Sequence, residues 1–431
     1  MGLTDNEFES LTPLEPLIDK CVHCGFCLPS CPSYVVVGQE MDSPRGRIYM
    51  MKAGAEGRLP MSDGMVAHFD TCLGCMACET ACPSGVRYAP LIEETRAAIE
   101  HHHTRPLGER VFRRVLFALL PYPARLRLLA WPLAFVNVLR GRKSLLSLLP
   151  AKVRNLIELA PDAGGSRSAA IPEHTPPAGE PRRRVGFVTG CVQQVFFGHV
   201  NEATVRVLAA EGCEVVAPRS QGCCGALALH SGRDDDARAF ARRLIETFEN
   251  TDVDAIVINA AGCGSSMKSY ADLFRNDPDW SARARAFAAK VRDVTELLAE
   301  LGTSRAHRHT LNMRVAYHDA CHLGHAQGIR QQPRDLLAAI PGVTLVPVAD
   351  GDLCCGSAGI FNLVQPEMAS ELGRRKAANI AAASPDIIAT TNPGCMLQIT
   401  AAARAAGTSR PIVHVVELLD ASIRGGQLTR P

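Results

Sequence analysis

Residues 71–86, TCLGCMACETACPSGV, decide how the N-terminal part of this chain folds. They hold four cysteines with the spacing Cys-x2-Cys-x2-Cys-x3-Cys, followed directly by proline. Residues 21–32, CVHCGFCLPSCP, repeat that spacing and also end in proline. Each tight loop turns three sulfur atoms inward and places the fourth one helical step further on. Two such runs are typical of a bacterial ferredoxin domain that holds two [4Fe-4S] clusters.

In that arrangement the fourth cysteine of each run binds the cluster of the other run. The expected ligands of the first [4Fe-4S] cluster are Cys21, Cys24, Cys27 and Cys82. The expected ligands of the second [4Fe-4S] cluster are Cys72, Cys75, Cys78 and Cys31. This exchange of ligands would tie the two runs into one small lobe.

Zinc is the alternative metal, because zinc also binds Cys-x2-Cys pairs. A zinc site draws on two separated pairs, whereas here four cysteines crowd into each segment and proline follows the last one. A disulfide framework is disfavoured, since the start of the chain, MGLTDNEFES, lacks the basic and apolar regions of a secretory leader. The sequence favours iron-sulfur clusters and leaves a non-redox zinc-binding scaffold as the competing class.

The composition limits the partners of the chain. Its 431 residues predict two or three domains. With 46 basic and 44 acidic residues and 5% aromatic residues, it gives no reason to expect nucleic acid binding. The most apolar window, 115–139, is interrupted by prolines and arginines, and no run reaches the roughly 18 residues of a spanning helix. We expect a cytoplasmic protein, at most peripherally attached to the inner face of the membrane.

Two segments outside the cysteine runs leave alternatives open. Residues 42–51, DSPRGRIYMM, predict a turn and then a helix carrying Arg45 and Arg47. Cations near a reduced cluster would raise its potential, but ordinary surface arginines fit the pattern equally well. Residues 106–160, rich in Leu, Val, Phe and Arg, predict helices packed on the ferredoxin lobe, with a docking face for a partner or membrane as the alternative.

The second half of the chain is a duplication. VGFVTGC, ending at Cys191, is matched by VAYHDAC, ending at Cys321, 130 residues later. QGCCGALA and NAAGC are likewise matched by DLCCGSAG and TNPGC, so each copy carries a Cys-Cys-Gly (CCG) unit. Cys213 corresponds to Val343 and is therefore expected to be apolar packing rather than a ligand.

The cysteines of each copy follow short β-rich runs, such as 185–189, 215–217 and 255–258. Helical patterns such as 237–248 and 367–382 alternate with these runs, which predicts parallel βαβ layers with the cysteines at the carboxyl edge of the sheet. A tentative third metal site would draw on Cys191, Cys223, Cys224, Cys263, Cys321, Cys354, Cys355 and Cys395. His318, Asp319 and His322 beside Cys321 are expected to be hydrogen-bonded at a strand end, and we assign no catalytic base.

The sequence therefore predicts a multidomain α+β fold. A small α-helical ferredoxin-like domain with two [4Fe-4S] clusters precedes a duplicated α/β domain with parallel sheets. The expected ranges are 1–105 for the ferredoxin lobe, 106–160 for a helical connection, 161–184 for a linker, 185–310 for the first CCG repeat and 311–431 for the second.

The paired ferredoxin runs, the DSPRGRIY segment, CPSGVRY and the two CCG units closely resemble the iron-sulfur subunits of glycolate oxidases, over essentially the full length. The resemblance implies an electron-transfer subunit that takes electrons from a flavin, expected to be FAD, on partner subunits and passes them to a respiratory, quinone-linked acceptor. Glycolate would be oxidised to glyoxylate on a partner. The chain itself has no Gly-x-Gly-x-x-Gly dinucleotide fingerprint.

Other families share this architecture. The anaerobic glycerol-3-phosphate dehydrogenase small subunit is similar, lactate or another 2-hydroxy acid is an alternative substrate, and heterodisulfide reductase subunits also carry CCG units. In the last family each unit ends in Cys-x2-Cys, whereas Ala260 and Asn392 stand at the first of those positions here. This departure argues against paired non-cubane clusters. It leaves one further iron-sulfur cluster, in either or both copies, with a zinc site or an empty remnant as alternatives.

Overall fold

The computed structural model describes residues 7–128, 136, 140, 151–160, 170–426 and 428. Its N-terminal lobe is built from short helices, and residues 7–128 contain no strand, as predicted for the ferredoxin-like part. These helices are η1 (Glu9–Leu14), α1 (Glu15–Ile18), α2 (Pro32–Val37), η2 (Glu40–Asp42), α3 (Pro44–Ala55), α4 (Asp63–Asp70), α5 (Ala77–Thr80) and α6 (Tyr88–His102).

Helix α3 begins where the sequence predicts. The Ser43 hydroxyl accepts a hydrogen bond from the N–H of Gly46, and Pro44 occupies the first helical position, where a missing N–H is tolerated. A side chain at Gly46 would place its Cβ 2.1 Å from the carbonyl oxygen of Glu40, so this close approach requires glycine. Met51 and Leu91 are fully buried and join α3 to α6 in one core.

The connecting region contains α7 (Leu107–Leu119) and α10 (Ala151–Leu159). One face of α7 packs Leu116 and Phe117 against Ile360 of the second repeat. On the same helix Leu107, Val111 and Val115, spaced four residues apart, are about half exposed or more. Arg113 of α7 also pairs with Glu100 of the ferredoxin lobe at 3.0 Å, so this helix packs on both domains. A docking role for its exposed apolar face stays a prediction. The predictions for 129–135, 137–139, 141–150 and 161–169 fall outside the described residues.

The first CCG repeat forms a five-stranded sheet with the order β1-β3-β2-β4-β5. Its strands are β1 (His174–Thr175), β2 (Arg183–Val188), β3 (Cys213–Val216), β4 (Ala255–Ile258) and β5 (Val291–Asp293). The helices are α11 (Cys191–Phe196), α12 (Gly198–Ala210), α13 (Ala226–Leu229), α14 (Asp234–Glu249), α15 (Ala261–Lys268), α16 (Tyr270–Leu273), α17 (Ser281–Lys290) and α18 (Val294–Glu300). All neighbours pair in parallel except β1, which pairs with β3 in antiparallel register.

Strand β1 lies inside the predicted linker 161–184, so that part of the linker belongs to the sheet. Two residues flanked by Pro172 and Pro176 are too few to give a strand pattern in the sequence.

The second repeat forms a four-stranded parallel sheet with the order β7-β6-β8-β9. Its strands are β6 (Met313–Tyr317), β7 (Val343–Val346), β8 (Ile387–Thr390) and β9 (Ile412–His414). Its helices are α19 (Cys321–Gly324), α20 (Gln331–Ala338), α21 (Phe361–Val364), α22 (Pro366–Ala382), α23 (Pro393–Ala405) and α24 (Val415–Ile423). Parallel sheets with helices between their strands confirm the predicted α/β duplication.

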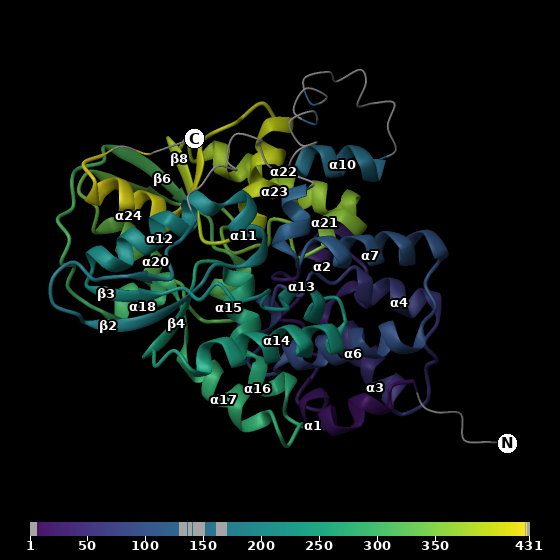
Figure 1. The fold of residues 1–431 in the computed structure, drawn as a ribbon. Helices are drawn as coiled ribbons and strands as arrows, with labels where there is room; N and C mark the ends of the chain where they lie inside the picture. The colour runs from purple at the N-terminus through teal and green to yellow at the C-terminus, as the bar shows by residue number, and fades with distance from the viewer. Residues whose placement is uncertain are drawn as a thin grey trace.

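The two repeats share one hydrophobic core. Helices α12, α18, α20 and α24 lie between the two sheets, and their buried side chains pack into a single cluster (Figure 1). Arg206 on α12 binds Asp420 on α24 through two hydrogen bonds of 2.9 and 2.8 Å. The ferredoxin lobe lies on one side of this pair, with α3, α4 and α6 on the right of the view and α7 of the connecting region beside them (Figure 1).

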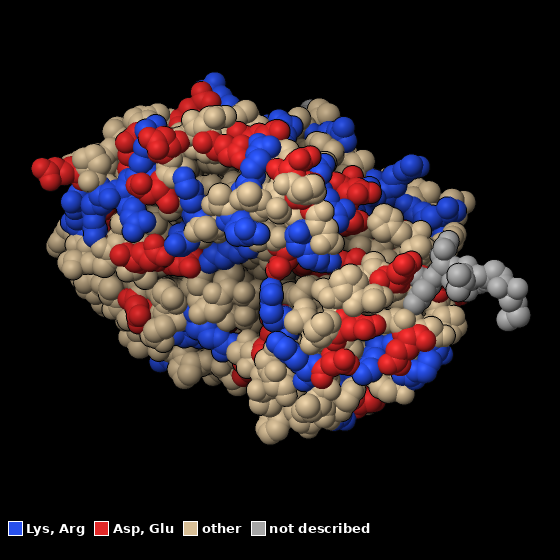
Figure 2. Space-filling view, turned by 90° about the horizontal axis from the view of Figure 1, so that it is seen from below, with Lys and Arg blue, Asp and Glu red and all other residues tan. Residues whose placement is uncertain are grey.

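On the face seen from below, basic and acidic side chains are interspersed with neutral ones (Figure 2). Within the described part of the chain, no helix is both long enough and apolar enough to span a membrane.

Candidate metal centres

Cysteines of both runs surround one cavity near the surface of the ferredoxin lobe. Cys21, Cys24, Cys27 and Cys82 line this cavity together with Ile48 and Tyr88, and Cys78 of the second run also reaches it. Of the four ligands expected for the first cluster, Cys24 is exposed and the other three are partly buried. Val22 and Phe26, which alternate with these cysteines, are 66% and 68% exposed. This first site therefore opens to the outside through an apolar rim.

The loop of the first site is held by Arg45. Its guanidinium donates a 2.9 Å hydrogen bond to the carbonyl of His23 and pairs with Glu40 at 2.6 Å. Gly25, at φ +87°, lies so close to Arg45 that a Cβ would be 2.8 Å from the guanidinium. Burial raises the pKa of the Cys27 thiol to about 11, against the opposing hydrogen bonds of the loop backbone. Arg45 is thus a partly exposed side chain that shapes the loop.

The second site lies deeper in the lobe. Cys31, at the start of α2, is close enough to Cys72, Cys75 and Cys78 that their charges act on one another. The N–H of Gly74 donates to Sγ of Cys72 at 3.4 Å. Both sites thus offer thiol donors, which suit iron-sulfur clusters.

Arg47 lies beside the second site and is 1% exposed. Its guanidinium donates to the carbonyl of His68 at 2.8 Å and to the hydroxyl of Thr71 at 2.9 Å. Burial acts to raise the pKa of the Cys72 thiol, but the charges of Arg47 and Arg96 outweigh burial and lower that pKa. Arg47 is therefore no surface arginine, and it favours negative charge at the second site.

The second site touches the second CCG repeat. Cys75 and Cys354 belong to one cluster of buried side chains, and Cys321 packs against it. Burial, followed by the charge of Cys321, raises the pKa of the Cys75 thiol well above its usual value. Nε2 of His322 donates a 2.8 Å hydrogen bond to the carbonyl of Gly74. Cys75 of the ferredoxin lobe thus lies next to Cys321 and Cys354 of the second CCG repeat.

The eight cysteines that match between the two CCG repeats line one cavity of about 300 Å³. They lie at the carboxyl ends of β2, β3 and β4 and of β6, β7 and β8, so the two sheets present matching edges to each other. The remaining wall is mainly apolar and includes Leu156, Phe196, Leu227, Leu363 and Leu397. The cysteines brought together are Cys191, Cys223, Cys224, Cys263, Cys321, Cys354, Cys355 and Cys395.

Within the cavity the thiols form close pairs. Sγ of Cys191 and Sγ of Cys223 are 3.6 Å apart, and the corresponding atoms of Cys321 and Cys354 are 3.9 Å apart. Contacts with Cys223 and Cys263 lower the pKa of the Cys224 thiol, whereas the same contacts raise the pKa values of Cys223 and Cys263. Sulfur donors gathered at this spacing fit a soft metal centre.

The polar residues beside Cys321 differ in whether their side chains have hydrogen-bond partners. Asp319 pairs with Arg334 at 2.6 Å, and His322 is bonded to Gly74, as expected for strand-end residues. His318 is the exception, because its ring nitrogens have no hydrogen-bond partner among the described residues. Cys213 is fully buried in the shared core on β3, in agreement with the packing role predicted for it.

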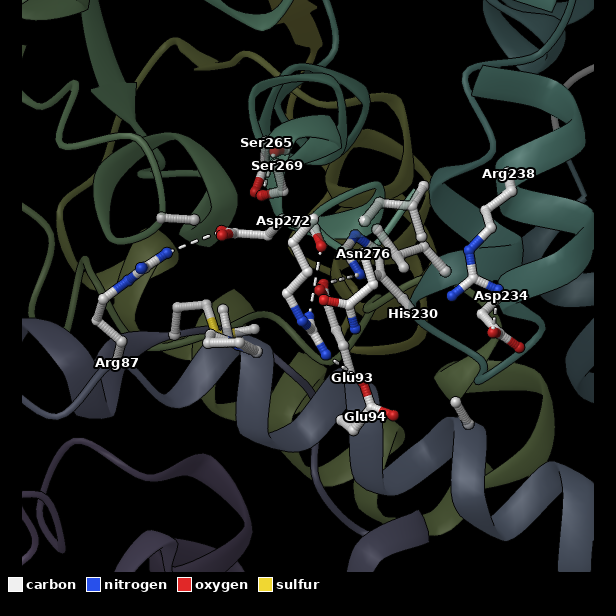
Figure 3. Close-up of a pocket in the computed structure, with 18 of the residues that line it drawn as sticks. Arg87, Glu93, Glu94, His230, Asp234, Arg238, Ser265, Ser269, Asp272 and Asn276 are labelled. Atoms are coloured by element: carbon white, nitrogen blue, oxygen red, sulfur yellow. Dashed lines mark hydrogen bonds and ion pairs between the residues drawn. The ribbon is translucent and has the colours of Figure 1, made fainter. Parts of the chain in front are cut away.

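A polar cavity of about 400 Å³ separates α6 of the ferredoxin lobe from the first repeat. In Figure 3, Arg87 reaches Asp272 across it, and Glu93 on α6 points toward His230. Nδ1 of His230 is 3.4 Å from Glu93, and its ring also lines the cysteine cavity. The sequence pattern gave no sign of this pair, since neither residue lies in a cysteine motif.

Comparisons with known proteins agree with this division of the chain. The family model described as a 4Fe-4S dicluster domain matches residues 17–86, and the model described as a cysteine-rich domain matches 185–268 and 315–400. The N-terminal lobe is therefore a domain for two [4Fe-4S] clusters.

Relatives are similar over nearly the whole chain. The probable glycolate oxidase iron-sulfur subunit of Bacillus subtilis (strain 168) is 38% identical over 97% of each chain, and the glycolate oxidase iron-sulfur subunit of Escherichia coli (strain K12) is 34% identical over 98% of each. Lactate utilization protein A of Exiguobacterium is 31% identical over 55% of this chain and 97% of its own. With its dicluster lobe, its paired cysteine-rich domains and this full-length similarity, the chain belongs to the family of glycolate oxidase iron-sulfur subunits.

Proposed function

We propose that this chain is the electron-transfer subunit of an oxidoreductase complex that oxidises glycolate, a CH–OH donor, to glyoxylate. The oxidation takes place on a flavin, FAD, held by partner subunits, and the electrons leave to a respiratory, quinone-linked acceptor. Each [4Fe-4S] cluster supplies a one-electron carrier when bound. The protein's part is to hold these carriers in order and to exclude water from them.

The observation that carries this proposal is the order of the thiols. They begin at the exposed rim around Cys24, continue through Cys78 and Cys75, and reach Cys321 and the cavity between the repeats. Electron transfer requires a continuous series of sites from the surface to the interior. Separate structural zinc sites would not require the contact between Cys75 and Cys321.

We assign the residues as follows. The first [4Fe-4S] cluster is held by Cys21, Cys24, Cys27 and Cys82, and the second by Cys31, Cys72, Cys75 and Cys78. The cavity lined by the eight CCG cysteines holds a further iron-sulfur centre. The proximity of Cys82 to Cys21, and of Cys31 to Cys75 and Cys78, supports this exchange of ligands between the runs.

The surfaces suggest where the partners bind. The apolar rim at Val22 and Phe26 leads to the first site and suits a flavin-binding subunit that delivers electrons. The exposed face of α7, with Leu107, Val111 and Val115, suits a partner or the cytoplasmic face of the membrane, as expected for a cytoplasmic subunit attached only peripherally.

The test is to purify the chain anaerobically with its flavin-binding partners, to add glycolate, and to record EPR spectra. We expect glycolate to reduce the clusters of this chain and a quinone analogue to reoxidise them. Lactate and glycerol 3-phosphate are run in parallel, because a relative is named for lactate utilization. Reduction by dithionite but by none of the three substrates would contradict the proposal. Reduction by lactate alone would assign the chain to a lactate-oxidising complex.

A further inference from the structure

The two CCG repeats differ at one buried position beside their cysteines. His318 directly follows β6, and the residue 130 positions earlier is Val188, the last residue of β2. Both residues are buried at the carboxyl ends of equivalent strands, and Val188 packs in an apolar cluster with Cys224. The second repeat therefore has an imidazole at the position where the first repeat has the apolar side chain of valine.

The His318 ring lacks the partners that a buried polar group requires. The residue is 2% exposed, and neither Nδ1 nor Nε2 has a hydrogen-bond partner among the described residues. Leaving such a buried polar group unpaired is energetically costly. Buried polar groups are nearly always satisfied, so an unpaired imidazole here indicates a missing ligand.

The ring lies next to two thiols. A ring nitrogen of His318 and the Sγ atoms of Cys355 and Cys395 all lie within 4.8 Å of one another, and all three residues are buried. Ligands of one tetrahedral ion at metal–sulfur 2.3 Å and metal–nitrogen 2.0 Å lie about 3.5 to 3.8 Å apart. A closure of about 1 Å would bring these three donors onto one metal ion.

A buried cation completes the surroundings. Lys376 donates hydrogen bonds of 2.5 and 3.1 Å to the carbonyls of Asp350 and Gly351, and it is 2% exposed. Its charge interacts favourably with the Cys355 and Cys354 thiolates. The second repeat thus places a buried cation beside its thiols, together with a nitrogen donor that has no hydrogen-bond partner among the described residues.

We propose that His318 is a nitrogen ligand to the iron-sulfur centre of the second CCG repeat, bound beside Cys355 and Cys395. The inference rests on the proposed function, specifically on the assignment of iron to the CCG cysteines. The first repeat, with Val188 in the same place, offers thiolates only. Exchange of a thiolate for a neutral imidazole raises the potential of an iron-sulfur centre, so the centre bound beside Cys355 and Cys395 has a higher potential than it would have with thiolate ligands alone.

The test uses the full chain, labelled with 15N-histidine, reconstituted anaerobically with iron and sulfide and then reduced. Electron-nuclear double resonance of the labelled protein should show the strong 15N coupling of a directly bound nitrogen. The coupling should vanish in His318→Val, which carries the residue of the first repeat. It should persist in His414→Asn, a control at a buried histidine outside the cysteine cavity. The His318→Cys variant should keep its iron and titrate at a lower potential.

Two results would overturn the inference. In the first, the labelled wild-type protein shows no strong 15N coupling, although Cys355→Ser loses iron. This result would reject His318 as a ligand and leave the assignment of iron to the CCG cysteines intact. An iron content that does not fall in Cys355→Ser or Cys395→Ser would reject both the ligand and the assignment on which it rests. The measurement on the labelled wild-type protein decides the question even if His318→Val does not fold.

Discussion

Nε2 of His322 lies 2.8 Å from the backbone carbonyl oxygen of Gly74, to which it donates a hydrogen bond. His322 follows Cys321 in the second CCG repeat, and Gly74 lies between Cys72 and Cys75 in the ferredoxin lobe. The bond therefore joins α19, which begins at Cys321, to the segment between Cys72 and Cys75. In the proposed electron path, transfer between the lobes depends on the distance between the thiols on these two segments.

His322→Leu should leave the iron content unchanged and slow the transfer of electrons to the acceptor. Loss of the bond would let the two cysteine-bearing segments move apart, and the rate of electron transfer falls as the distance between the carriers grows. Turnover with an artificial acceptor and with the quinone should be compared by stopped flow. His102→Leu, at an exposed helix end, is the control. Equal rates in both variants would exclude a role for the His322 bond.

The proposed exchange of ligands between the two runs predicts which signal each cysteine variant loses. Cys31→Ser should remove the same cluster signal as Cys72→Ser, although Cys31 lies in the other run. Cys82→Ser should remove the same signal as Cys24→Ser. EPR titration of the reduced variants measures this, with Cys213→Ser as a control that keeps both signals. If Cys31→Ser instead matched Cys24→Ser, each run would bind its own cluster.

Arg47→Met should destabilise the lobe and lower the potential of the second cluster. The change leaves the Asp42 carboxylate, 3.5 Å from the guanidinium and nearly buried, without its cation. Breaking such a buried pair costs about 3 to 5 kcal/mol. Redox titration and urea unfolding should therefore both shift, whereas Arg45→Met, at a partly exposed position, should change mainly the first site. An unchanged second-cluster potential in Arg47→Met would contradict the electrostatic role.

Stability should fall in mild acid because of His414. Burial lowers the pKa of this histidine to about 4, against opposing backbone hydrogen bonds, and neutral Nδ1 accepts the N–H of Val416 at the start of α24. Between about pH 6.5 and 4 the unfolded chain binds more protons than the folded one, so stability is lost as the pH falls through this range. The loss amounts to about 3 kcal/mol.

The His414→Asn variant keeps a capping side chain and removes the titration. Anaerobic urea unfolding at pH 7 and pH 5 should give a smaller acid shift for this variant than for the wild type. His101→Asn, with an exposed side chain, should behave as the wild type. An acid shift of equal size in all three proteins would show that His414 does not titrate in this range.

The ferredoxin lobe and the duplication could be predicted because their information is local. The cysteine spacing and the match between the segments that end at Cys191 and Cys321 can be read from short stretches of sequence, without knowledge of the tertiary structure. The meeting of eight cysteines in one cavity depends on how the two sheets dock, which no local pattern records. The burial of Arg47 and the unpaired ring of His318 were hidden for the same reason, since each is decided by residues far away in the sequence.

Metal analysis of the anaerobically purified full chain, with EPR of the dithionite-reduced protein, tests the central claim most directly. The account predicts about eight irons from the two interacting [4Fe-4S] clusters of the ferredoxin lobe, and about twelve when the CCG cavity holds one further cluster. Stoichiometric zinc without an EPR signal would contradict it and leave a structural scaffold in place of an electron-transfer chain.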